Sequence, residues 1–238
     1  MLPQPTQTKA EISVSEKKAD MHRRLWAAIA EGRLEPGSKI VEREILEPYG
    51  VSFTISRQVL MTLEQQGMVT LTPNHGAAVA SPSRLEAIAR VRIAALLAAD
   101  AAGEMSSAKR RLRLEAVGIC TTLVTAANND DEAAAVSLFL QLINLMATHA
   151  AGPLMAEQTL IAVAAAKLAM RANRCERPLL HVATELEQSL SIGDTDLAQN
   201  ALRGYYDAVT RKLQAPAKSG RLRDMFLSPP AGMFSPPE

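Results

Sequence analysis

The side chains of this chain that could carry catalytic or metal chemistry are four histidines, two cysteines and a short acidic run. Cys120 and Cys175 lack the paired spacing of a zinc site and are too few for a disulfide framework, so we expect buried thiols in a reducing compartment. The acidic run at 130–132 is typical of a helix N-terminus, which attracts negative charge. The sequence shows no paired-carboxylate, Ser-His-Asp or phosphate-loop pattern, and therefore we do not expect an enzyme.

Composition and charge are those of a globular protein. The chain has 238 residues, of which 47% are hydrophobic, and this is enough for packed cores. A formal net charge of +1 neither requires nor excludes nucleic acid, because phosphate contact depends on where the cations lie. The N-terminus is polar, and no uninterrupted apolar run approaches the roughly 18 residues of a membrane span. We therefore expect a cytoplasmic protein without membrane contact.

The elements that would position a binding surface begin near residue 18. Residues 1–17 are polar and contain prolines, which predicts a flexible arm. Three helical stretches follow, each ending at a glycine: Gly32, Gly50 and Gly67. The pattern then changes to strand, turn and strand between residues 68 and 80. Three short helices and a hairpin predict a winged helix-turn-helix domain over residues 18–80.

The remainder of the sequence predicts an all-α helical bundle, so the expected fold class is mainly α. A Ser-Pro-Ser segment indicates a linker at 81–84. Residues 85–213 are rich in Ala and Leu and predict about six helices in an effector and dimerisation domain. The proline-containing tail at 214–238 predicts disorder.

In two parts of this bundle the sequence also indicates where helices begin and end. A nearly all-apolar helix is expected at 132–149, in the centre of the domain, and should stop near Gly152-Pro153. A helical pair is expected at 180–192 and 195–213, with Asp194 or Thr195 capping the second helix.

Five segments of the N-terminal domain follow a known pattern: Ile29 to Ile40, Gly50-Val51-Ser52 with Arg57, Leu63-Glu64, Gly67-Met68-Val69, and Pro73 to Ala80. In their order and spacing they resemble the winged-helix domain of the GntR family of regulators. The closing Gly193-Asp194, Ala198 and Leu202 are similar to the FCD type of effector domain in the FadR/VanR branch of that family.

The resemblance implies that the third helix enters the major groove of double-stranded DNA and that the wing tip enters the minor groove. An arginine there can contact a guanine edge or a phosphate, and hydroxyls with helix amides suit phosphate oxygens. The expected DNA-contacting residues are Arg43, Ser52, Phe53, Thr54, Arg57, His75 and Gly76.

The chain departs from the family pattern within the third helix. Phe53 replaces the usual arginine, Ile55 the usual proline and Gln58 the usual glutamate. Phe53 could contact a thymine methyl, which would change the sequence preference. Because acidic residues also balance the basic ones in this domain, we expect weak binding by a monomer and reliance on a homodimer.

The FCD resemblance implies a divalent metal held by an aspartate and three histidines, a ligand set that suits zinc or nickel. The corresponding positions here are Val136, Leu140, Ala183 and Tyr205. We therefore expect no metal and no cofactor. The pocket between these helices should be apolar and could bind a small organic acid or an apolar effector, or it could be filled core. Its expected lining is Arg92, Val136, Ser137, Leu140, His149, Ala183 and Tyr205.

Two functions remain open on these grounds. The first is a ligand-responsive transcription regulator, a repressor, that acts as a dimer on a palindromic operator. The second is a helical interaction protein that has lost specific DNA recognition and works by pairing with a partner. The wing and Arg57 favour the first, whereas Phe53 and the balanced charge favour the second.

Overall fold

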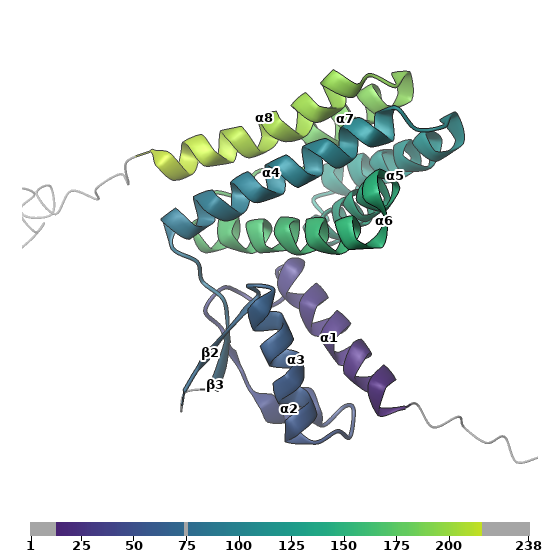
Figure 1. Cartoon of the computed structure of the whole chain (residues 1–238). Coiled ribbons are helices and arrows are strands. Elements are labelled where there is room, and N and C mark those ends of the chain that lie inside the picture. Colours follow the sequence, from purple (N-terminus) through teal and green to yellow (C-terminus); the bar gives the residue numbers. More distant parts are fainter. Residues whose placement is uncertain (1–12, 74–75, 216–238) are drawn as a thin grey trace, which may run out of the picture.

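The structure, a computed structural model, describes residues 13–73 and 76–215. A small domain of three helices and a three-stranded sheet lies beneath a helical bundle, and the two are joined by the segment before α4 (Figure 1). The mainly α fold class and the winged helix are as predicted.

The N-terminal domain is built on three helices: α1 (Val14–Ala30), α2 (Glu42–Leu46) and α3 (Phe53–Gln65). In α1, Met21, Leu25 and Ile29 recur at helical spacing and are buried. A capping box starts this helix, because the Ser13 side chain accepts from the backbone amide of Glu16 and the Glu16 side chain accepts from that of Ser13. The helix therefore begins inside the segment 1–17, which was expected to be a flexible arm.

The strands β1 (Lys39–Ile40), β2 (Val69–Thr72) and β3 (Gly76–Val79) form an antiparallel sheet in the order β1-β3-β2, in which the β2–β3 hairpin is the wing. Val69 pairs with Val79, and Thr72 pairs with Gly76. The hairpin was predicted, whereas the short strand β1 was not. Its pairing with β3 places Lys39 and Ile40 beside the wing.

The bundle consists of α4 (Arg84–Ser106), α5 (Arg110–Asn128), α6 (Glu132–Ala172), α7 (Leu180–Ile192) and α8 (Thr195–Gln214). Helix α4 packs between α6 and α8, and α5 packs against α6 and α7. The buried face of α4 is made mostly of alanines, which allows its neighbours to approach closely. Asp194, one of the two residues predicted as the cap, caps α8 by accepting from the backbone amide of Leu197 at 2.9 Å.

Helix α6 is interrupted at the expected place. Ala151 and Gly152 have non-helical backbone angles, and Pro153 begins the second half, which continues to Ala172. Because α6 consists of one helix on each side of this break, residues 84–215 contain six helical segments, the number expected. By length and composition alone α6 could span a membrane. Its buried residues, among them Phe139 and Leu142, pack into the bundle as those of a core helix do.

Candidate functional site

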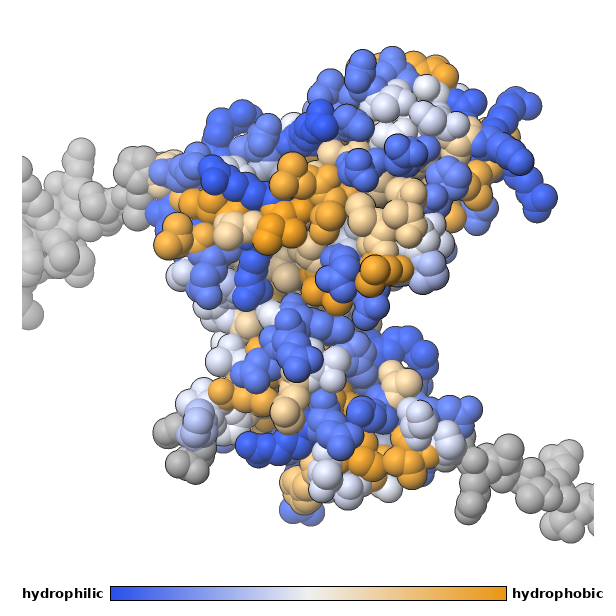
Figure 2. Space-filling view, viewed as in Figure 1, coloured by the Kyte–Doolittle hydropathy of each residue, from blue (hydrophilic) through white to orange (hydrophobic). Residues whose placement is uncertain are grey.

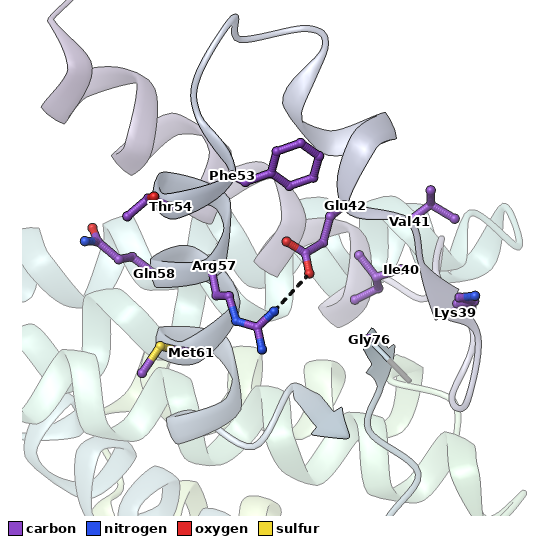
Figure 3. A pocket seen from close by; sticks show the side chains of 10 residues that line it. All are labelled: Lys39, Ile40, Val41, Glu42, Phe53, Thr54, Arg57, Gln58, Met61 and Gly76. Atoms are coloured by element: carbon purple, nitrogen blue, oxygen red, sulfur yellow. Dashed lines mark ion pairs between the residues drawn. The ribbon is translucent and has the colours of Figure 1, made fainter. Parts of the chain in front are cut away.

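Helix α3 has one face in the core and one in solvent. Ser56, Val59, Leu60 and Leu63 are buried, and this fixes which side chains must point outward. The outward residues line an open cleft of about 770 Å³ between α3, β1 and the start of the wing (Figure 3). The cleft is lined by Lys39, Ile40, Val41, Glu42, Phe53, Thr54, Arg57, Gln58, Met61 and Gly76.

The guanidinium of Arg57 lies in this cleft, beside the carboxylate of Glu42. The guanidinium lies 3.8 Å from the Glu42 carboxylate, and the Arg57 side chain remains 65% exposed (Figure 3). Ser56 donates to the same carboxylate at 3.3 Å. An exposed ion pair of this kind contributes about 0–1 kcal/mol. Arg57 can therefore exchange Glu42 for a phosphate or a base edge at small cost.

The other residues predicted to contact DNA do not all line the cleft. Phe53, Thr54 and Gly76 line the cleft together with Arg57. Ser52 is the N-cap residue of α3, but its side chain makes no capping hydrogen bond. Arg43 lies on α2, outside the cleft lining, and donates to Glu47 at 2.9 Å. His75 lies outside the described residues.

Sequence reasoning missed several residues of this surface. Lys39 and Val41 reach it because β1 pairs with the wing. Gln58 and Met61 follow Thr54 at helical spacing, and this periodicity could have identified them. Gln58 is also fixed from outside the helix, because Lys18 of α1 donates to its side chain at 2.9 Å.

The residues expected to line an effector pocket do not form one surface. Val136, Leu140, Ala183 and Tyr205 are buried in the bundle, whereas the remaining three are exposed: Arg92, Ser137 and His149. Among the seven, Val136 alone lines a described cavity, which it shares with the buried Lys167. Lys167 was missed, although a single lysine inside an apolar helical stretch is a recognisable signal.

The positions at which the FCD resemblance would place metal ligands carry side chains that do not suit a metal. Val136, Leu140 and Ala183 have no donor atom in their side chains. Tyr205 donates to the carbonyl of Arg177 at 3.3 Å and packs against Phe139, while burial raises the pKa of its hydroxyl. Across residues 13–73 and 76–215 no group of three or more His, Cys, Asp or Glu side chains could hold an ion.

Comparison with known proteins gives a family match for the N-terminal domain. Residues 18–79 match the model of the gntR family of bacterial regulatory proteins. The matched segment runs from α1 to β3 and leaves out only the first turn of α1. No curated protein matches the sequence.

Two solved structures share the overall fold. E. coli McbR/YncC has a TM-score of 0.66 and 16% identity, over 85% of this chain and 97% of its own. A chain from Rhodococcus sp. RHA1, described as a GntR transcriptional regulator, has a TM-score of 0.66 and 18% identity over 83% of this chain and 97% of its own. The likeness extends through the bundle, because coverage of this magnitude includes both domains.

Proposed function

We propose that this chain, whose residues 18–79 match the gntR family model, is a ligand-responsive transcription repressor that binds a palindromic operator as a homodimer. The observation that supports this most directly is the cleft beside α3. It groups an exposed arginine, a hydroxyl, an amide and an aromatic ring on the face that a winged helix turns toward DNA.

Each side chain of that face has a distinct use in the major groove. Arg57 can make a bidentate contact to guanine or bind a phosphate. The Thr54 hydroxyl lies in the first turn of α3, where helix amides also favour phosphate oxygens. Phe53 can contact a thymine methyl. Gly76, at the start of β3, would bring the wing backbone close to the minor groove.

A dimer is supported by the exposed face of α4. Leu85, Ile93 and Leu96 are 79%, 52% and 71% exposed and lie along one side of this helix together with Ala89. Figure 2 shows hydrophobic residues gathered over α4. An apolar stripe of this length on a water-facing helix is typical of an interface. Pairing through α4 about a two-fold axis would present two α3 helices to two half-sites.

The second candidate function uses the same surfaces differently. Phe53 and Met61 are exposed apolar side chains on the face of α3, and Glu42 places a negative charge among them. Such a face could contact a protein partner in place of DNA. In that case the chain would bind DNA of any sequence equally weakly.

A binding experiment separates the two functions. The full chain is titrated by fluorescence anisotropy against DNA from the region upstream of its own gene and against random DNA of equal length, over a series of salt concentrations. We expect tighter binding to the upstream DNA that persists at salt concentrations where random DNA is released. Equal binding to both DNAs at every salt concentration would overturn the regulator proposal and favour the interaction protein.

A further inference from the structure

A cavity of about 430 Å³ opens at the end of the bundle, where the start and the last turns of α6 meet the segment before α7. Its walls are largely apolar, and the charged side chains that line it are Asp130, Glu132, Lys167, Glu176 and Arg177. Asp130 and Glu132 are exposed, so water screens their charges. Lys167 is different, because its side chain is only 2% exposed.

Two buried cations share one carboxylate at this cavity. The Lys167 ammonium lies 3.9 Å from Glu176 Oε1, a distance too long for a hydrogen bond, and the Arg171 guanidinium lies 3.2 Å from the same oxygen. The Lys167, Arg171 and Glu176 side chains are 2%, 9% and 30% exposed. Burial lowers the pKa of Lys167, and Arg171 lowers it further, against the opposing effect of Glu176. When Lys167 is protonated, the two cations of this cluster exceed its single carboxylate by one positive charge.

Arg171 connects this cation pair to the DNA-binding domain. Its guanidinium donates to the carbonyl of Ile29, near the end of α1, at 3.4 Å and lies directly over Gly32. In Figure 1 the same end of α1 lies against α6. If the Glu176 carboxylate moved toward one of these two cations, the position of the Arg171 guanidinium against the end of α1 would change as well.

We propose that this cavity binds a small carboxylic acid with an apolar body, whose carboxylate pairs with Lys167 and releases Glu176 to Arg171. The apolar walls, which include Ala127, Ala135, Val136 and Leu179, surround the body of the ligand. The ligand supplies the negative charge that the site lacks, and the strengthened Glu176–Arg171 pair alters the contact of Arg171 with α1. The regulatory consequence rests on the proposed function, whereas the binding site does not.

The binding site is tested without DNA. The full chain is titrated by calorimetry, at constant ionic strength, with acetate, isobutyrate, benzoate and succinate, with the amide of each, and with inorganic phosphate. We expect at least one carboxylate to bind while its amide does not. If no carboxylate binds, or if phosphate binds as tightly as the best carboxylate, the proposed ligand class is wrong.

Variants assign the binding to the cavity. Lys167→Met should abolish carboxylate binding, and Lys109→Met, which removes an exposed lysine at the start of α5, should leave it unchanged. Glu176→Gln removes the competing carboxylate and should tighten binding at least about tenfold, the factor typical of a charged hydrogen bond gained. This second variant keeps the test decisive if Lys167→Met fails to fold. Unchanged affinity in Glu176→Gln would place the carboxylate elsewhere.

The connection to α1 has its own optical readout. Trp26, the single tryptophan of the chain, lies on α1 and lines a groove against α6. Ligand binding should change its fluorescence in the wild type, and Arg171→Met should retain binding while losing that change. A fluorescence response that persists in Arg171→Met would overturn the role of Arg171. Because neither measurement contains DNA, failure of the cavity and failure of the regulator function are separable.

Discussion

Gly32 lies beneath the guanidinium of Arg171, so closely that a Cβ at this position would overlap it. Gly32 comes from the turn after α1, whereas Arg171 comes from the end of α6, so this contact joins the two domains. The backbone of Gly32 is also left-handed, with φ of 82°. Two independent requirements therefore select glycine here.

Gly32→Ala should destabilise the protein by about 2–3 kcal/mol, through backbone strain and through displacement of Arg171. Gly37→Ala is the matched control, because Gly37 has φ of 80° and, within the described residues, its Cβ would meet no neighbouring atom within 4 Å. It should cost only about 1 kcal/mol. Chemical denaturation followed by Trp26 fluorescence measures both. Equal losses in the two variants would show that the Arg171 contact contributes nothing.

Leu96→Glu should weaken self-association, because it places a charge in the apolar stripe of α4 that we assign to the dimer. The dissociation constant of the dimer should rise at least about tenfold, as measured by analytical ultracentrifugation. Folding should be unaffected, because Leu96 is exposed and such substitutions change stability by about 0.5 kcal/mol or less. Leu114→Glu makes the same change at an exposed leucine of α5 and should leave the association constant as it is. A monomeric wild type would disprove the assignment directly.

Cys120 should be unreactive toward thiol reagents in the native protein. Burial raises the pKa of its thiol to about 12, so that at pH 8 its thiolate fraction is about a thousandth of that of an ordinary cysteine. Burial also raises the pKa of Cys175. Labelling with a chromogenic disulfide at pH 8 should be slow until denaturant is added, after which both thiols react. Rapid modification of Cys120 without unfolding would contradict its placement in the core.

The sequence predicted those features that local chemistry determines. Asp194 follows a glycine that ends α7 and precedes an amphipathic helix, and these signals located both helix ends. The wing hairpin was predicted equally well, because the spacing of apolar residues changes from helical to strand-like after Gly67. The early start of α1 was readable too, because Ser13 and Glu16 form a capping box, but the polar composition of the segment outweighed that signal.

Features that depend on distant contacts were not predictable in this way. β1 is a two-residue strand that exists because β3 returns beside it. Arg92 and His149 lie on helices that were expected, but which side of a helix meets its neighbours is decided by the packing of the whole bundle. The cavity at Lys167 requires two parts of α6 and the segment before α7 to meet, so a single lysine in the sequence does not reveal it.

Arg57→Ala should lower affinity for the operator about tenfold to a hundredfold, since losing a base or phosphate contact costs about 1–3 kcal/mol. Arg203→Ala removes an exposed arginine of α8 and is the control for loss of charge alone. The salt dependence distinguishes the two uses of Arg57. Loss of a phosphate contact reduces the slope of log affinity against log salt by about one, whereas loss of a guanine contact relaxes the sequence preference. Equal affinities for the two variants would remove Arg57 from the interface.

Glu42→Gln should change DNA affinity in the opposite direction. The carboxylate lies 3.8 Å from Arg57 on the surface that would face phosphates, so it both occupies the arginine and repels DNA. Glutamine removes the charge but keeps an oxygen that can accept the hydrogen bond from Ser56, so α3 should keep its position. We expect affinity for operator and random DNA to rise about threefold to tenfold, with a larger gain at low salt. In the double variant Glu42→Gln with Arg57→Ala, the gain should be smaller than in Glu42→Gln alone, because part of it comes from releasing the arginine. An additive double variant would show that the ion pair does not restrain Arg57, and that Glu42 acts on DNA by repulsion alone.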